Sequence, residues 1–299
     1  MKRKWCSTMK NAILGVNHQF LFPRAIEDAP THTKTLCEAA AYDNIQALDC
    51  WLWRGQRAEE EKRILLDSGK VINYNIGDRF GETPLFPVSP DAAEQTRAYD
   101  TLMREIEYAL AVNSKKIVFA SGPDYPQDRS GAFQRLGELV LKISKQLPSD
   151  VMLALEPTDR DIDKYFLLGP LSETVSFVET LKEQGVNIGI LLDMCHIPIV
   201  HETLDSALEK AKEQLVHIHL GNCLISNPNS PFYGDKHIPW DYPEGEYSSE
   251  HGTYFLKQLE KIGYFKPGAT VSFEMRPIEG LTAKESLDRF VEVFQKASI

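Results

Sequence analysis

Short apolar runs alternate with amphipathic stretches from one end of the chain to the other. Eight of the runs have the length and composition of buried strands. They are Ala12–Val16, Ala47–Leu52, Lys70–Asn75, Lys116–Ala120, Val151–Leu155, Ile188–Leu192, Leu215–Leu220 and Thr270–Phe273. Runs that are nearly all apolar are typical of strands covered on both faces. Their alternation with helices predicts a parallel sheet joined by crossover helices.

The stretches between the runs carry apolar residues at helical spacing. Leu102, Ile106 and Leu110 recur every four residues, which predicts a helix with one apolar face. Gly69 and Gly185 each stand between such a stretch and the next apolar run, where a left-handed residue commonly ends a helix. These glycines therefore mark two helix ends.

Eight β/α units in 299 residues favour a closed barrel over an open sheet, because closure removes both sheet edges. No GxGxxG motif follows the first run, which weakens a dinucleotide-binding interpretation. The predicted fold is thus α/β, a (β/α)8 TIM barrel, with residues 1–299 as one domain. The segment 221–252 is rich in Pro, Gly, Asn and Asp, and it follows the seventh strand, so we expect a functional loop over the barrel mouth.

Composition narrows the functional classes. The net charge of −10 disfavours nucleic acid as a partner. The five cysteines form no CxxC pair, which fits reduced thiols, and no apolar stretch reaches the length of a membrane span. We expect a cytoplasmic protein without a membrane partner, and a homo-oligomer is left open.

The last four predicted strands each deliver a potential metal ligand to the same rim. They end LALE at Glu156, ILLD at Asp193, VHIHL with His219, and VSFE at Glu274. A single carboxylate there can simply cap a helix or meet a lysine. Three crowded carboxylates repel one another, so a divalent cation is the economical explanation. Three oxygen donors and one imidazole suit Mn, Mg or Co, or Zn with an open position.

A second group lies nearby in the sequence. His196 follows the strand-six aspartate by three residues, and Asp235 and His237 lie within the long loop. One hypothesis is that these three residues hold a second metal. The alternative is that His196 binds a substrate hydroxyl while Asp235 and His237 order the loop.

Other candidates carry weaker signals. Arg276, two residues beyond Glu274, can clamp an anionic group of a substrate or balance the carboxylates. Trp53, after the second strand, can stack on a sugar or pack at the rim. His217 shares a face with His219 one layer deeper, which favours a hydrogen-bonded core histidine over a ligand.

At these residues the chain resembles the xylose isomerase-like barrel superfamily, which includes sugar phosphate isomerases and epimerases, inosose dehydratases and AP endonuclease family 2. In the epimerase branch, strands five to eight end in the metal ligands that match Glu156, Asp193, His219 and Glu274, and a histidine matching His196 contacts the substrate. The endonuclease branch has D-x-C-H and D-x-H motifs like 193–196 and 235–237. That branch also needs histidines after strands three and four, which here read YNIG and ASGP.

The leading hypothesis is therefore a metal-dependent isomerase or epimerase that acts on a ketose or related polyol carbonyl through an enediolate. Glu156 and Glu274 would remove and return the proton from opposite sides. The alternatives are a dehydratase, which would expel a β-hydroxyl from the same intermediate with His196 or His237 as acid, and a phosphodiesterase of the endonuclease type. A barrel that binds sugars without chemistry is the rival outside enzymes.

Overall fold

A computed structural model describes residues 9, 11–77 and 85–298. The strands are β1 (Ile13–Asn17), β2 (Ala47–Cys50), β3 (Val71–Asn75), β4 (Lys116–Phe119), β5 (Met152–Leu155), β6 (Ile188–Asp193), β7 (Leu215–Leu220) and β8 (Thr270–Phe273). The helices are α1 (His18–Leu21), η1 (Pro23–Ile26), α2 (Ala29–Ala40), α3 (Gln56–Ser68), α4 (Ala92–Ala111), α5 (Arg129–Ser144), α6 (Leu171–Glu183), α7 (His196–Ile199), α8 (Leu204–Ala211), α9 (Ser249–Lys261) and α10 (Ala283–Ala297).

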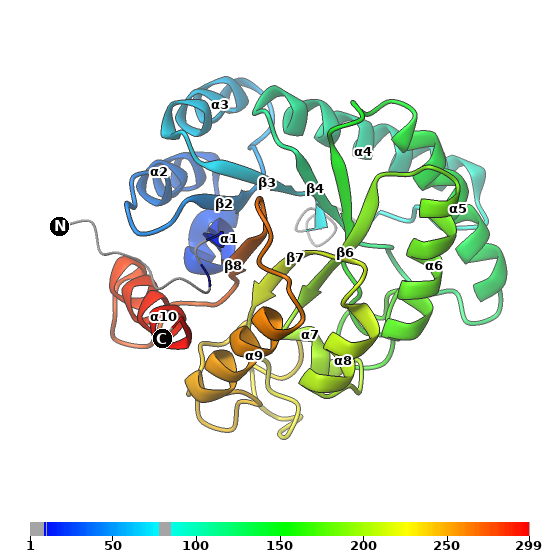
Figure 1. Ribbon diagram of the computed structural model, residues 1–299. Helices are drawn as coiled ribbons and strands as arrows, with labels where there is room; N and C mark the ends of the chain where they lie inside the picture. The colour runs from blue at the N-terminus through cyan, green and yellow to red at the C-terminus, as the bar shows by residue number, and fades with distance from the viewer. Residues whose placement is uncertain (1–8, 10, 78–84, 299) are drawn as a thin grey trace.

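The eight strands form one closed parallel barrel in chain order, and β8 closes it by pairing with β1. Figure 1 shows the helices arranged around this barrel. Each predicted strand is present, with ends that differ from the prediction by at most two residues. The TIM-barrel prediction is therefore confirmed, and all eight strands direct their carboxyl ends to the same rim.

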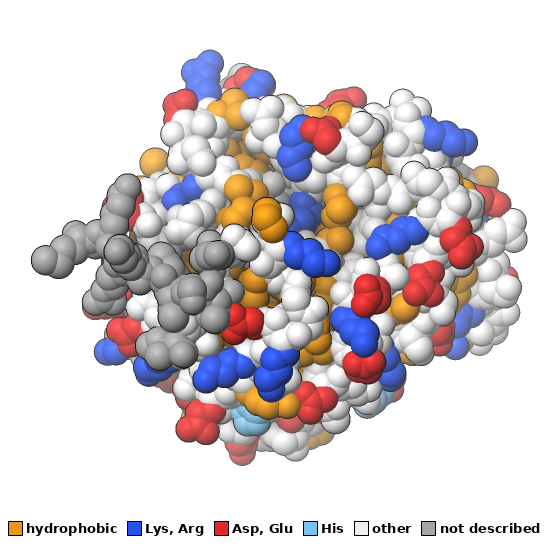
Figure 2. All heavy atoms as spheres, in the orientation of Figure 1, with side chains coloured by type: hydrophobic (Ala, Val, Ile, Leu, Met, Phe, Trp, Pro, Cys, Tyr) orange, Lys and Arg blue, Asp and Glu red, His pale blue; other side chains and the backbone are white. Residues whose placement is uncertain are grey.

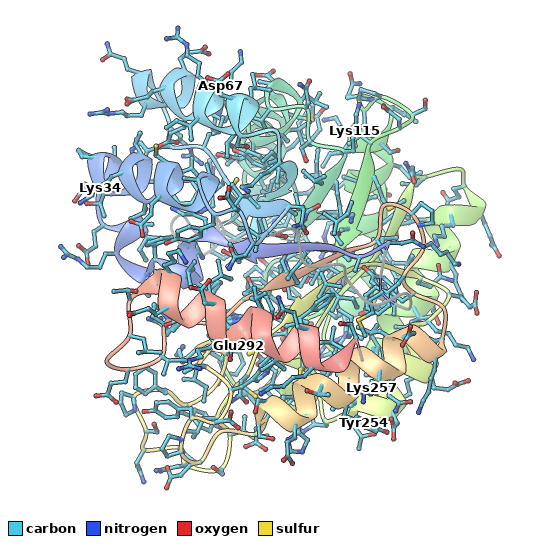
Figure 3. The ribbon with its side chains drawn as sticks, turned by 60° about the vertical axis from the view of Figure 1, so that its left-hand side comes forward. Lys34, Asp67, Lys115, Tyr254, Lys257 and Glu292 are labelled. Carbon is cyan, nitrogen blue, oxygen red and sulfur yellow. The ribbon has the colours of Figure 1, made fainter. Side chains whose placement is uncertain are left out.

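The helices are amphipathic in the manner that the sequence predicts. Leu102 and Ile106 of α4 are buried, and the left-handed Gly69 ends α3. Charged side chains lie on the outer faces, as Figure 3 shows for Asp67 on α3 and Glu292 on α10. None of the helices within the described residues is long and apolar enough to cross a membrane.

The barrel interior is polar on one side and apolar on the other. Asp49 of β2 reaches across the interior to β7, where the ring nitrogens Nε2 of His217 and His219 lie 2.5 Å and 3.0 Å from its Oδ1. Val118 and Leu191 belong to a separate buried apolar cluster on strands β4 to β6. A buried polar network of this kind is stable only when its members are hydrogen-bonded, and it specifies their positions closely.

The long loop after β7 differs from the prediction at its end. Helix α9 begins at Ser249, so residues 249–252 are helical and the loop covers 221–248. The signal is a capping box, in which Ser248 and His251 bond each other's backbone. Serine followed by histidine is a less familiar form of this box than serine followed by glutamate.

Candidate metal centre

Four buried side chains from consecutive strands converge at the carboxyl end of the barrel. Glu156 directly follows β5, Asp193 ends β6, His219 lies near the end of β7, and Glu274 directly follows β8. One ligand atom from each lies within 4.8 Å of every other. The parallel register places them together, because Asp193 pairs with His219 across β6 and β7.

Three of these side chains direct an unpaired atom toward the others. Asp193 Oδ2, His219 Nδ1 and Glu274 Oε2 are buried and form no hydrogen bond of regular geometry. His219 Nδ1 lies in close contact with Glu274 Oε2 and 3.9 Å from Glu156 Oε1. Buried polar atoms are almost always paired, so their convergence fits a ligand that completes the set.

The remaining atom of each group is held by the protein. Glu274 Oε1 accepts a hydrogen bond from Asn17 Nδ2 at 2.6 Å. Asp193 Oδ1 accepts one from the backbone amide of Cys195 at 2.7 Å. His219 Nε2 lies 3.0 Å from Asp49 Oδ1, so a ring proton on Nε2 is held by Asp49, and Nδ1 is the nitrogen that would bind a metal.

The charges in this cluster are poorly balanced without a cation. Burial raises the pKa of Glu156, and burial together with the charge of Glu274 raises the pKa of Asp193 to about 7. Burial also opposes ionisation of Glu274, but His219 and His237 hold its pKa down at about 2. A divalent ion would stabilise all three carboxylates as anions. The donor set of three carboxylates and one imidazole therefore fits Mn, Mg, Co or Zn.

The second predicted group lies beside the first. His196 Nε2 and His237 Nε2 lie 3.3 Å and 2.7 Å from Asp235 Oδ1. Lys164 Nζ lies 3.0 Å from Asp235 Oδ2, and the charges of Lys164 and the two histidines hold the pKa of Asp235 well below its usual range although burial opposes this. Lys164 thus already supplies positive charge to Asp235.

A cavity of about 280 Å³ opens onto both groups. Its lining includes Glu156, Glu274, His196 and His237. Phe20 contributes an aromatic wall, with its ring centroid 3.9 Å from that of His237. This volume is just below the usual range for small-molecule sites, so the cavity suits a small substrate.

Two predicted substrate contacts lie elsewhere. Arg276 is not part of the cavity lining, and its Nε donates to the backbone oxygen of Lys236 at 2.8 Å, so it holds the long loop. Among the described residues no carboxylate lies within 4 Å of its guanidinium. Trp53 packs against Trp51 and His32, with centroids 5.6 Å and 5.5 Å away, outside the cavity lining.

His217 is a core residue, as its position one layer deeper predicts. Its Nε2 bonds Asp49 at 2.5 Å, and its Nδ1 lies 2.7 Å from Thr270 Oγ1 and 3.1 Å from the Thr270 carbonyl. Both ring nitrogens are therefore satisfied within the barrel. Asp49, His217 and His219 also lie close enough together to bind a metal. Both histidines contact Asp49 Oδ1 directly, so hydrogen bonds explain why these three side chains lie together.

The sequence analysis missed Asp49, Lys164 and Phe20. Asp49 interrupts the apolar run ALDC, and a charged residue inside a buried strand is itself a signal of a functional interior. Lys164 and Phe20 lie in loops or short helical turns without a periodic pattern, so no comparable signal points to them.

Comparisons with known proteins agree with the barrel fold. A curated relative, D-psicose 3-epimerase of Ruminiclostridium cellulolyticum, is 27% identical over 178 residues, which span 58% of this chain and 58% of the relative's length. A structure of an AP endonuclease, family 2, from Brucella melitensis has a TM-score of 0.68 at 19% identity, with 93% of this chain and 98% of that chain covered.

A structure of IOLI protein with a binding zinc atom has a TM-score of 0.65 at 16% identity, with 95% of this chain and 97% of that chain covered. At these identities the two structures show a common fold. The family model that matches residues 37–293 is described as xylose isomerase-like TIM barrel, and it covers most of the sequence. The chain therefore belongs to the xylose isomerase-like TIM barrel family.

Proposed function

We propose that this chain is a divalent-metal-dependent epimerase or isomerase of a ketose or related polyol carbonyl, working as a single barrel domain. The observation that carries the proposal is the convergence of Glu156, Asp193, His219 and Glu274 within 4.8 Å around unpaired buried atoms. The similarity to D-psicose 3-epimerase supports a sugar as the substrate class.

The four residues would hold one ion, Mn, Mg, Co or Zn, through a carboxylate oxygen from each acid and Nδ1 of His219. When bound, such an ion would polarise the substrate carbonyl and stabilise the negative charge that develops on its oxygen. Asn17, Asp49 and the Cys195 amide support this geometry, because each holds an atom of a ligand residue that does not face the ion.

Glu156 and Glu274 would exchange the proton on the carbon next to the carbonyl. They follow β5 and β8, which are not neighbours in the barrel, so their carboxylates approach the cavity from different strands. One glutamate would remove the proton from one face of the carbon, and the other would return a proton to the opposite face. Burial excludes bulk water from both carboxylates, so the two glutamates rather than water would move the proton while the substrate is bound.

His196 and His237 would bind substrate hydroxyls at the cavity wall. We favour this role over a second metal because the Lys164 ammonium lies 3.0 Å from Asp235 and already neutralises it. A second cation bound to Asp235 would have to share that carboxylate with the ammonium. The endonuclease type of chemistry is further disfavoured because the structure has Asn75 at the end of β3 and Phe119 at the end of β4, where histidines would be needed.

The test is incubation of the metal-loaded protein in deuterated water with D-psicose, D-tagatose and D-fructose, followed by NMR of the recovered sugar. We expect one ketohexose to be converted to its epimer with deuterium at the inverted carbon. Glu156→Gln and Glu274→Gln should each lower turnover by about a thousandfold or more. Glu292→Gln, on the exposed face of α10, is the matched control and should retain turnover.

Other results would support a different reaction or contradict the proposal. Loss of water from the sugar, with an unsaturated or deoxy product, would establish the dehydratase alternative. Cleavage of an abasic-site duplex, together with more than one metal ion per chain by elemental analysis, would establish the phosphodiesterase. Undiminished turnover in metal-free Glu156→Gln would refute the assigned roles altogether.

A further inference from the structure

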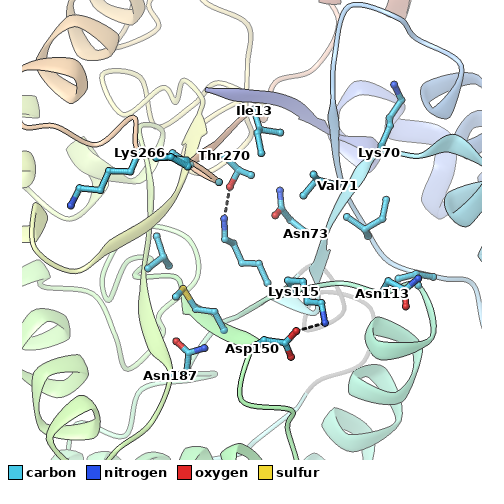
Figure 4. A pocket seen from close by; sticks show the side chains of 18 of the residues that line it. Ile13, Lys70, Val71, Asn73, Asn113, Lys115, Asp150, Asn187, Lys266 and Thr270 are labelled. Carbon is cyan, nitrogen blue, oxygen red and sulfur yellow. Dashed lines mark hydrogen bonds and ion pairs between the residues drawn. The ribbon is translucent and has the colours of Figure 1, made fainter. Parts of the chain in front are cut away.

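A second cavity lies at the amino-terminal end of the barrel, at the opposite end from the candidate metal centre. Its lining includes the first residues of several strands, among them Ile13, Val71, Lys116, Met152 and Thr270. Its volume of about 810 Å³ lies within the range of small-molecule sites. Figure 4 shows Ile13, Val71 and Thr270 around one space, and Figure 2 shows lysine or arginine side chains deep in a hollow between hydrophobic ones.

The ammonium of Lys116 is the unusual group in this cavity. Its Nζ donates to the Thr270 hydroxyl, and no carboxylate of the described residues lies within 4 Å of it. Burial lowers the pKa of Lys116 to about 8, and the charge of Asp49 opposes that change. A partly desolvated ammonium without a carboxylate partner costs free energy that an anionic ligand would offset.

The other cations of the cavity are engaged or lie at its edge. Lys115 Nζ lies 2.6 Å from Asp150, and Lys70 Nζ donates to the carbonyls of Tyr42 and Ile45 at 2.7 Å and 2.9 Å. Lys266 is exposed. Lys116 is therefore the cation best placed to meet a ligand within the cavity, and a single positive charge matches a monoanion better than a phosphate dianion.

The position of Lys116 is fixed by a chain of hydrogen bonds. Thr270 Oγ1, which accepts from Lys116, lies 2.7 Å from Nδ1 of His217, and Nε2 of His217 lies 2.5 Å from Asp49. An ammonium that is already oriented loses less side-chain entropy when a ligand binds. Asn73 also lines the cavity, and its buried Oδ1 has no hydrogen-bond partner. The inner end of the cavity therefore presents polar atoms and not only apolar core side chains.

Part of the cavity wall is apolar. Ile13, Val71, Met152, Leu215 and Tyr264 contribute to it. We propose that this cavity binds a small aliphatic carboxylate, whose anionic group pairs with Lys116 and whose chain packs against this part of the wall. The proposal is independent of the metal chemistry, because the cavity at this end shares no lining residue with the cavity at the metal centre.

Isothermal titration calorimetry of the full-length protein tests the proposal, with butyrate, hexanoate and octanoate as probes. We expect one saturable site per chain and tighter binding with chain length, because each added methylene buries apolar surface. The neutral analogue 1-hexanol and inorganic phosphate should each bind at least about tenfold more weakly than hexanoate.

Two variants and a control locate the site. Lys116→Met keeps the aliphatic stem and should weaken hexanoate binding by about thirtyfold. Lys116→Arg keeps the charge and should restore most of that binding. Lys266→Met removes an exposed lysine at the same cavity and should change the affinity by less than about threefold.

Circular dichroism must first show that each variant is folded. If Lys116→Met fails to fold, two other results test whether the carboxylate pairs with Lys116. Lys116→Arg should keep most of the hexanoate binding, and 1-hexanol should bind more weakly than hexanoate. Failure of the wild-type protein to bind any of the carboxylates overturns the proposal. So does hexanoate binding that Lys116→Met leaves intact or that 1-hexanol matches.

Discussion

Asp49 Oδ1 lies 3.0 Å from Nε2 of His219, while Nδ1 of the same ring faces Glu274 and Glu156. The two residues come from β2 and β7, which are not neighbouring strands, so their side chains contact each other across the barrel interior. Burial alone would raise the pKa of Asp49, but His217 and His219 hold it well below its usual range, so Asp49 stays ionised. An ionised acceptor at this position keeps the proton of His219 on Nε2.

Asp49→Asn should therefore weaken divalent metal binding by about ten- to a hundredfold, because an amide no longer fixes the tautomer and orientation of His219. Titration of Mn²⁺ into the metal-free protein measures the change. Asp67→Asn removes one carboxylate from the exposed face of α3 and should keep the wild-type affinity. Equal affinities in Asp49→Asn and the wild type would show that Asp49 does not position the ligand.

Gly221→Ala should disturb the metal centre, because the added Cβ would crowd a ligand residue. A Cβ at this position would meet Cys195 Cβ at 2.7 Å and Asp193 Oδ1 at 2.8 Å, so the aspartate would have to move. We expect a loss of about 1–3 kcal/mol in the free energy of unfolding, as for other overpacked sites, together with weaker metal binding.

The matched control for this substitution is Gly137→Ala. That glycine lies within α5, and an added Cβ would meet only Phe177, at an ordinary 3.8 Å. Because alanine favours helix, this variant should be about as stable as the wild type or more stable by up to about 1 kcal/mol. Urea unfolding compares the two, and a Gly221→Ala protein as stable as Gly137→Ala would contradict the packing argument.

A bound divalent ion should stabilise the fold. With Mn²⁺ at a hundred times its Kd, the free energy of unfolding should rise by about 2.7 kcal/mol, because the ion binds the assembled ligands and not the unfolded chain. Thermal unfolding with Mn²⁺ and with a chelator measures the gain. Asp193→Asn should lose most of it, and Glu292→Gln should keep it. An identical Tm in both conditions would argue against a metal at this centre.

Lys116 should make stability rise with pH in the alkaline range. Its pKa is about 8 in the folded protein and about 10.4 in an unfolded chain, so between these values the unfolded chain binds more protons. The wild type should gain up to about 2 kcal/mol relative to Lys116→Met between pH 7 and pH 9.5. Urea unfolding of both proteins at the two pH values provides the comparison, and parallel pH profiles would contradict it.

The sequence by itself determined the barrel and the four residues at its rim. Buried strands and amphipathic helices are local patterns, and parallel strands in a barrel always end on the same side. Glu156, Asp193 and Glu274 could therefore be placed together from their positions at the ends of apolar runs.

Only the tertiary structure decided which side chains meet across the barrel and where the loops lead. Asp49 reaches His219 because of the register and closure of the strands, which no local pattern encodes. Arg276 and Trp53 follow strands as the ligands do, yet one holds the backbone of the long loop and the other packs against Trp51. Beyond a strand end the chain direction depends on long-range packing, so spacing in the sequence no longer indicates what a side chain contacts.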